Sequence, residues 1–423
     1  MNLPGVVTTC CIYILVQRWV LGTNSRWREA AFAVLNLIAV YAIYYSADHN
    51  LSGLLTYCAL VVVQYLPFRW WAERTDGWGW VAFLIPILIL AVHLLTQVEV
   101  WVLAHVVPAW LSEPLLGKLR QKLAVNPAYK IGSGEIGLSF LCFRTSYLVL
   151  EVRNRIVKRP GFWAYLGFAL FAPTLLLGPI SPYSEHSRAF SALDRPRLPV
   201  GQSLLRILVG LVKLKFFATI LNLASYSSLF FDGVPHGWEA LPIAAIAYYL
   251  FLYCNFSGFC DIAIGVAGLI GIPVAENFAW PFGARNLREF WNRWHMTLTR
   301  FMRDVVFTPL SKWLARMLGS GAGAHAVVLP IIAVFLLIGI WHGVTWPYAV
   351  FGLIQAIGLI INHYYSLALK TWLGRTRLAA YNRNPTIQTL AVALTNAYFC
   401  ASLFFFANDS DEITTILSRL HGR

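Results

Sequence analysis

The sequence has 423 residues, of which 58% are hydrophobic, 15% are aromatic and only 12% are charged. An ordinary soluble protein has about 25% charged and about 45–50% apolar residues. Several uncharged apolar runs reach about twenty residues, the length that a helix needs to cross a bilayer. The composition therefore predicts a polytopic membrane protein and excludes a soluble enzyme, a secreted disulfide scaffold and a disordered tail.

The net charge of +14 comes from Lys and Arg residues that lie in short stretches between the apolar runs. Basic residues in such positions set membrane topology and meet anionic headgroups, so we expect the lipid bilayer and not nucleic acid as the partner. The basic loops 22–28 and 68–77 predict that the N-terminus lies outside the cytoplasm. The seven cysteines show no C-x-x-C spacing, so neither a disulfide framework nor a metal site is implied.

In chain order, the apolar runs predict about ten to thirteen membrane segments within one integral domain covering residues 1–423. They lie at 4–21, 29–46, 51–67, 78–97, 98–112 (shorter), 136–150, 161–180, 204–231, 240–256, 259–272, 326–341, 346–362 and 388–407. The stretches 113–130 and 151–160 are both basic although one span separates them. We therefore expect that some segments enter the membrane without crossing it, as irregular backbone does when it is buried in protein or lines a wet cavity.

In the stretch 253–282, Asp261 interrupts an apolar run that is rich in glycine. Closely spaced glycines let helices approach each other, and a lone carboxylate there needs a cationic partner. A structural ion pair with an arginine or a histidine is favoured over proton transfer. Arg144, in the run FLCFRTSYLVLEV, is a second buried-charge candidate.

The stretch 285–310 has apolar residues spaced by one, three or four, which predicts one face of a basic helix. Asn286 followed by Glu289 predicts a capping box, and Pro309 is expected to mark the far end. The helix is too basic to span, so it should lie along the interface or inside the fold. His295 lies beside the aromatic face, where composition alone favours a hydrogen-bonded structural histidine over a functional one.

The stretch 326–362 contains no Asp, Glu, Lys or Arg, and its one imidazole is His342. Gly343 and Pro347 predict a turn directly after it, at the bend of an apolar helical hairpin. The arm 326–341 would rise only about 24 Å, less than the roughly 30 Å of hydrocarbon, so His342 is expected to be buried short of the far surface. An ionisable group there indicates a functional site, and an interfacial histidine between Trp341 and Trp346 is an equally good interpretation.

At these residues the chain resembles the membrane-bound O-acyltransferase family, in the bacterial branch that acts in alginate O-acetylation and in D-alanyl transfer to teichoic acid. The matching motifs are NFSGFCDIAIGVAGLIGIPVAENFAWPF, ARNLREFWNRWHMTLTRFMRDVVFTPL and GIWHGVTW, with weaker support from LSFLCFRTSYLVLEVRN and TLLLGPISPY. The resemblance implies an all-α membrane fold of about eleven transmembrane helices, with re-entrant or interfacial helices, around a central funnel or tunnel. One departure is Asn255, where relatives often carry Asp.

The resemblance also implies two signature histidines, which map to His295 and His342, the second as the catalytic residue. Further residues in or near the motifs are expected to bind substrate or support the histidines, namely Trp341, Trp294, Asn292, Arg293, Asp261, Asp304 and Arg144. The sequence carries no G-x-S-x-G elbow, phosphate loop or H-E-x-x-H pattern. No tightly bound cofactor and no metal are therefore expected.

The activity implied by the resemblance is transfer of an acetyl or D-alanyl group from a cytoplasmic thioester to a hydroxyl outside the membrane. The expected enzyme class is an acyltransferase for groups other than aminoacyl or D-alanyl groups. The donor is an acyl carrier protein or acyl-CoA, and the acceptor is a cell-envelope polymer or an accessory transferase. The expected location is a bacterial inner membrane. The basic 285–316 surface either docks an acidic carrier protein or is an ordinary membrane-facing loop.

Two alternatives come from other functional classes. A transporter or flippase for envelope precursors would show inverted repeats and several intramembrane charges along a pathway. A non-catalytic scaffold for polysaccharide export would tolerate replacement of both histidines. The sequence shows neither repeats nor such a series of charges, so acyl transfer is the favoured interpretation.

Overall fold

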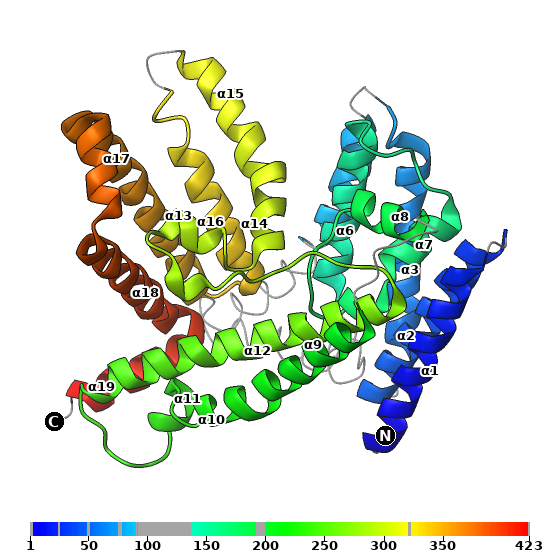
Figure 1. Ribbon diagram of the computed structural model, residues 1–423, viewed down its shortest axis with the longest axis horizontal. Helices are drawn as coiled ribbons and strands as arrows, with labels where there is room; N and C mark the ends of the chain where they lie inside the picture. Colours follow the sequence, from blue (N-terminus) through cyan, green and yellow to red (C-terminus); the bar gives the residue numbers. More distant parts are fainter. Residues whose placement is uncertain are drawn as a thin grey trace, which may run out of the picture. The chain divides into compact units, whose positions relative to one another are not determined.

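A computed structural model describes residues 3–23, 26–48, 51–74, 78–89, 91, 137–191, 199–319 and 323–421. Every regular element within these ranges is a helix (Figure 1). The expected segment 98–112 and the basic stretch 113–130 lie outside the described residues. The described part confirms a helical fold, whereas the number of about eleven spans stays a prediction.

The chain divides into two compact units, residues 1–210 with 259–275 and residues 211–258 with 276–423. The prediction of a single integral domain stays a prediction. The first unit contains α1 (Leu3–Gly22), α2 (Arg28–Asp48), α3 (Leu51–Trp71), a helix at Trp78–Ile89, α6 (Leu138–Arg153), α7 (Phe162–Ala169), the 3-10 turn η2 (Ala172–Thr174), α8 (Tyr183–Ser191) and most of α9 (Val200–Val212). The last part of α12 (Ala240–Ile270) also belongs to it.

The second unit begins with the π-helical turn η3 (Lys213–Phe217) and contains the first part of α12 and the C-terminal helices. Its elements are α10 (Ala218–Asn222), α11 (Tyr226–Leu229), η4 (Pro281–Gly283), α13 (Leu287–Trp291), α14 (Met296–Met302), the π-helical turn η5 (Arg303–Phe307), α15 (Thr308–Leu318), α16 (Val328–His342), α17 (Trp346–Arg383), α18 (Pro385–Ala407) and α19 (Ser410–His421). Within the described residues, α12, α17 and α18 are long and apolar enough to cross a membrane.

The glycine-rich run forms one continuous helix, α12, so the expected pair of spans 240–256 and 259–272 is wrong. The glycines serve packing instead of breaking the helix. A Cβ on Gly265 would lie 2.6 Å from a side-chain carbon of Ile207 and 2.7 Å from the backbone oxygen of Ser203. Only a glycine therefore lets α9 approach α12 this closely.

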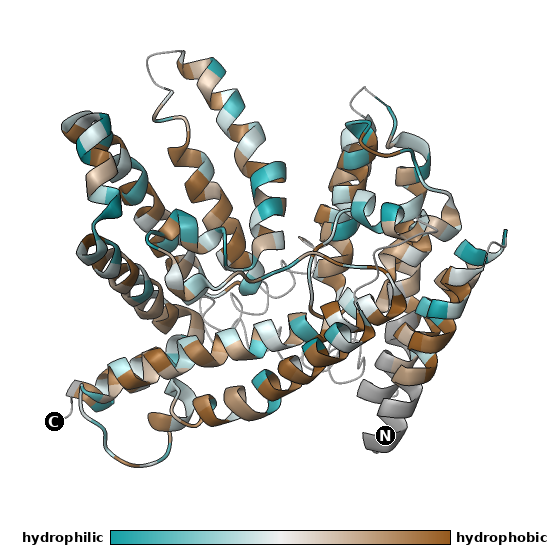
Figure 2. Ribbon diagram, in the orientation of Figure 1, coloured by the Kyte–Doolittle hydropathy of each residue, from teal (hydrophilic) through white to brown (hydrophobic). Residues whose placement is uncertain are grey.

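The expected helix over 285–310 is also wrong, because it breaks at residues 292–295 into α13 and α14. Its start is as expected, since the side chain of Asn286 accepts a hydrogen bond from the backbone N–H of Glu289 at 2.9 Å. Pro309 does not mark the end, because the helical run continues through it to Leu318, with the π-helical turn η5 directly before α15. In Figure 2, α15 alternates between hydrophilic and hydrophobic residues, whereas α16 is hydrophobic along nearly its whole length.

The apolar hairpin predicted around His342 is present as α16 and α17, which run side by side (Figure 1). The first helix ends at His342 and the second begins at Trp346, with Pro347 in its first turn. A Cβ on Gly339 would lie 2.3 Å from the backbone oxygen of Tyr348, and one on Gly352 would lie 2.4 Å from that of Phe335. These two glycines bring the helix backbones together.

Candidate functional site

Two loops of the second unit, 277–280 and 293–296, are joined by backbone hydrogen bonds. The N–H of Met296 donates to the oxygen of Asn277, and the N–H of Ala279 donates to that of Arg293, both at 3.0 Å. His295 lies between α13 and α14 in the left-handed region, with φ 45° and ψ 52°. This conformation costs a non-glycine residue roughly 1–2 kcal/mol, so the surrounding contacts must hold it.

The side chain of Asn277 supplies those contacts. Its Oδ1 accepts hydrogen bonds from the backbone N–H of Thr297 at 3.1 Å and from the Thr297 hydroxyl at 2.9 Å. The same oxygen lies 3.2 Å from Nδ1 of His295. All three side chains are buried, Asn277 completely. The turn and the imidazole are therefore fixed together by one carboxamide.

The His295 ring lies among aromatic rings. It meets the Phe256 ring edge-on, with centroids 4.7 Å apart, and the Trp341 indole lies 6.4 Å away. Its second nitrogen, Nε2, is buried and has no hydrogen-bond partner among the described residues. A buried polar atom without a partner is costly, and such atoms occur where a site receives a ligand or a reactant.

His342 is the last residue of α16 and lies against the rings of Trp341 and Phe406, with centroids 4.5 Å and 4.8 Å away. His342 is exposed, and its expected depth within the membrane stays a prediction. The helix ends at this residue. Both imidazoles therefore contact the indole of Trp341, one buried and one accessible.

Buried polar contacts hold the helices that carry these rings. The indole N–H of Trp291, on α13, donates to Gln355 of α17 at 3.2 Å, and the Gln355 amide donates to Ser402 of α18 at 2.6 Å. Trp294 stacks on Phe290 with ring centroids 5.6 Å apart. The two hydrogen bonds join the 287–294 segment to α17, and α17 to α18.

Three other expected site residues lie on this segment (Asn292, Arg293) or beyond it in η5 (Asp304), and no hydrogen bond or ring contact described joins them to either imidazole. Asn292 is exposed at the end of α13. Arg293 pairs with Glu289 at 2.5 Å, and Glu289 also pairs with Arg285 at 3.5 Å, each arginine four positions from the glutamate. Asp304, in η5, is 3.2 Å from Nε of Arg303. Their role in binding substrate stays a prediction.

Arg144 and Asp261 belong to the first unit. Arg144 donates to the backbone oxygens of Phe168 and Thr174, at 3.0 Å and 2.6 Å, and so satisfies carbonyls at the broken end of α7 and η2. Asp261 pairs with Arg206 at 2.8 Å, the ion pair expected for a lone carboxylate. Both contacts are structural, and a further role in the site stays a prediction.

Sequence reasoning missed the residues that surround His295, namely Asn277, Thr297 and Phe256, and also Phe406 beside His342. The one available signal was a lone Asn between Ala275 and Trp280 in an otherwise mostly apolar stretch. An amide there needs partners once it is buried. Its partners, however, lie about twenty positions further along the chain.

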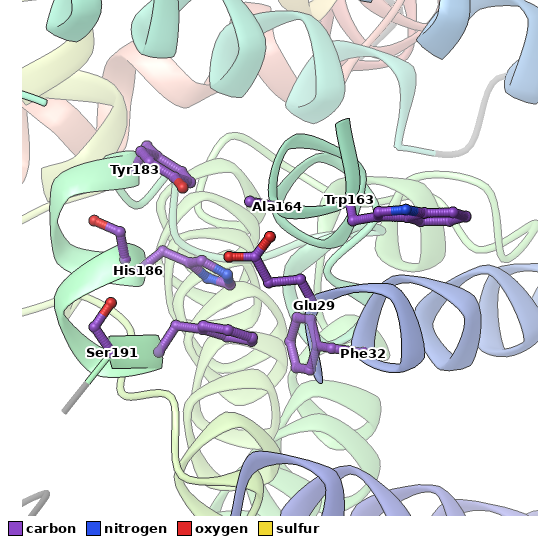
Figure 3. A pocket seen from close by; sticks show the side chains of 9 residues that line it. Glu29, Phe32, Trp163, Ala164, Tyr183, His186 and Ser191 are labelled. Carbon is purple, nitrogen blue, oxygen red and sulfur yellow. The ribbon is translucent and has the colours of Figure 1, made fainter. Parts of the chain in front are cut away.

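A hollow lies in the first unit, away from both imidazoles in the sequence (Figure 3). It is lined by Glu29, Phe32, Trp163, Ala164, Tyr183, His186, Ser187, Phe190 and Ser191. Its volume of about 40 Å³ holds two or three water molecules, which is too little for an acyl donor. Within the described ranges, no group of three His, Cys, Asp or Glu side chains is placed to hold a metal ion.

Comparison with known proteins gives consistent matches. Residues 28–404 match the family described as MBOAT, membrane-bound O-acyltransferase family. The chain is 25% identical to a teichoic acid D-alanyltransferase of Bacillus subtilis over 93% of its own length and 94% of the relative. It is 32% identical to a peptidoglycan O-acetyltransferase of Helicobacter pylori, over 49% of this chain and 39% of that one. It is 27% identical to a probable alginate O-acetylase of Pseudomonas syringae, over 54% and 42%.

These matches confirm the resemblance drawn from the motifs. The chain spans less than half the length of the Helicobacter and Pseudomonas relatives. One expectation is overturned, since the enzyme class was expected to exclude D-alanyl groups. The relative that matches nearly the whole chain is a D-alanyltransferase, so that exclusion is wrong.

Proposed function

Since the chain belongs to the membrane-bound O-acyltransferase family, we propose that it moves an acyl group across a bacterial inner membrane to a hydroxyl of a cell-envelope polymer or of a relay protein. The donor in this proposal is a cytoplasmic thioester, carried by an acyl carrier protein or by CoA. A tightly bound cofactor is not part of the proposal.

The observation that carries the proposal is the meeting of His295 and His342 at one indole, that of Trp341. Both histidines lie within the segment that matches the family, 28–404. A transporter or a scaffold gives no reason for two imidazoles to converge with one nitrogen buried and unpartnered. Acyl transfer does, because a hydroxyl needs a base before it attacks an acyl carbon.

In the proposed step, the acceptor oxygen attacks the carbonyl carbon of the thioester. A neutral His342 takes the hydroxyl proton as the new C–O bond forms, then gives it to the thiolate as the C–S bond breaks. The products are an ester and a free thiol, and the base returns to its neutral form. General-base help of this kind contributes about 10²- to 10⁴-fold to the rate. His295 orients one of the reacting groups.

Of the two acyl groups, D-alanyl is favoured because the match to the D-alanyltransferase covers nearly the whole of both chains. Acetyl is the second candidate, favoured by the higher identity of 32% to the peptidoglycan O-acetyltransferase over about half of this chain. The two groups share the same ester-forming chemistry, and D-alanyl differs from acetyl by one more carbon and an amino group.

The test is to express the intact chain and its His342→Gln variant in cells that lack the gene. Esters are then released from the envelope with mild alkali and identified by mass spectrometry as D-alanine or acetate. We expect the variant to lose about 10²-fold or more of the released group while its membrane level stays unchanged.

His363→Gln is the matched control. His363 lies on α17, is half-buried, and its Nε2 lies 3.0 Å from the backbone oxygen of Ala324. Esterification should be normal in this variant. Full esterification in His342→Gln would remove His342 from the base role. Full esterification in a double variant of His342 and His295 would favour the scaffold.

A further inference from the structure

The orientation of the Asn277 carboxamide follows from one backbone group. The N–H of Thr297 donates a hydrogen bond to the Asn277 atom that lies 3.1 Å away. A backbone N–H can only donate, so that atom must be the carboxamide oxygen and cannot be the NH₂ group. The Thr297 hydroxyl, 2.9 Å from the same oxygen, is consistent with this assignment.

The orientation of Asn277 in turn determines where His295 carries its proton. Nδ1 of His295 lies 3.2 Å from the same oxygen, so Nδ1 must donate. A neutral imidazole has one N–H, and its other nitrogen then carries a lone pair. The apolar rings around His295 favour the neutral form over the imidazolium. Nε2 is therefore a hydrogen-bond acceptor.

Nε2 is the nitrogen that is buried without a partner among the described residues. It can be satisfied only by a group that donates a hydrogen bond. A thioester carbonyl and the oxyanion formed from it both accept, so neither can be held by Nε2. The hydroxyl of an acceptor molecule can donate, and so it fits.

We propose that Asn277 is a positioning residue, which holds His295 in the Nδ1–H form so that Nε2 accepts a hydrogen bond from a hydroxyl of the acceptor other than the one that His342 deprotonates. This inference rests on the proposed function and narrows it. His295 binds the acceptor side of the reaction, and the thioester carbonyl and the oxyanion are held by other groups.

The first experiment measures the tautomer itself. The full chain is labelled with ¹⁵N-histidine in lipid nanodiscs, and the His295 signals are assigned by their loss in His295→Asn. We expect a protonated Nδ1 and an unprotonated Nε2 in the intact chain and in Asn277→Asp, since a carboxylate oxygen also accepts from Nδ1 and from Thr297. In Asn277→Leu the signal should shift to the other tautomer or to a mixture.

The matched control is Asn396→Leu, which removes a second well-bonded asparagine of the same unit. Asn396 accepts from the Tyr249 hydroxyl at 2.9 Å and donates to the oxygen of Phe282 at 2.9 Å. Its loss should lower stability and leave the His295 tautomer unchanged. A protonated Nε2 in the intact chain, or an unchanged tautomer in Asn277→Leu, would overturn the proposal.

The second experiment separates the two substrates kinetically, with a D-alanyl thioester as donor and a soluble teichoic acid fragment as acceptor. In Asn277→Leu, kcat/KM for the acceptor should fall at least about tenfold, while KM for the donor stays within about twofold. In Asn277→Asp, kcat/KM for the acceptor should return to most of its value in the intact chain. A loss confined to the donor would overturn the inference. Absence of transfer by the intact chain would overturn the proposed function, while the tautomer measurement would still decide the role of Asn277.

Discussion

Nε of Arg206, on α9, lies 2.8 Å from a carboxylate oxygen of Asp261, on α12. The Asp261 side chain is 10% exposed and the Arg206 side chain 34%, so the pair is largely removed from water. The substitution Asp261→Ala removes the carboxylate and leaves the partly buried guanidinium of Arg206 without this partner. We expect the free energy of unfolding to fall by about 2–3 kcal/mol, less than for a fully buried pair. Thermal unfolding of the two proteins in detergent micelles measures this loss of stability.

The double variant Arg206→Leu, Asp261→Leu is the control for this pair. It removes both charges and keeps apolar volume, so it should be more stable than Asp261→Ala. Ester formation per folded molecule should be normal in both variants. Loss of transfer in Asp261→Ala with unchanged stability would instead place the carboxylate in the chemistry.

Arg144 satisfies the backbone oxygens of Phe168 and Thr174 through two nitrogens of one guanidinium. Lysine carries one ammonium and cannot reproduce this fork. We expect Arg144→Lys to lower the free energy of unfolding by about 2–3 kcal/mol, because a buried carbonyl loses its donor. The exposed Arg188 is the matched position, and Arg188→Lys should change stability by less than about 0.5 kcal/mol. Equal stability of the two variants would show that the Arg144 contacts contribute nothing.

The close packing of α16 against α17 depends on Gly339 and Gly352, where a Cβ would lie 2.3 Å and 2.4 Å from backbone oxygens. Gly339→Ala should push the helices apart and cost about 1–3 kcal/mol. His342 follows three residues later on the same helix, so transfer should fall as well. Gly201→Ala is the control, since nothing lies within 4 Å of that position. Unchanged transfer in Gly339→Ala would show that the hairpin spacing does not position His342.

Local sequence signals predicted local structure correctly. The Asn286 cap depends on a residue three positions away, and the turn after His342 depends on Gly343 and Pro347. These features are decided by hydrogen bonds and backbone preferences within a few residues, which a single sequence displays.

Contacts between distant residues were not predictable in the same way. The sequence indicated that the carboxylate of Asp261 needs a cationic partner. It did not indicate which basic residue this is, because Arg206 lies 55 positions earlier in the chain. The helix break at His295 was not predicted either, because the helical spacing of apolar residues in 285–310 continues through it. That break is held by hydrogen bonds to Asn277, whose position 18 residues earlier carries no spacing signal. The exposure of His342 depends on where its helix stops and on what lies against it.

The left-handed backbone at His295 gives a prediction that separates folding from chemistry. Asparagine tolerates φ 45° far better than a β-branched residue does. We therefore expect His295→Asn to unfold at nearly the temperature of the intact chain, whereas His295→Val should lose about 1–3 kcal/mol of stability. Both variants should lose transfer, because neither has a ring nitrogen at the position of Nε2. If His295→Asn proved as unstable as His295→Val, the ring contacts with Phe256 and not the backbone would determine the cost. If His295→Asn kept full transfer, the imidazole would have no part in the reaction.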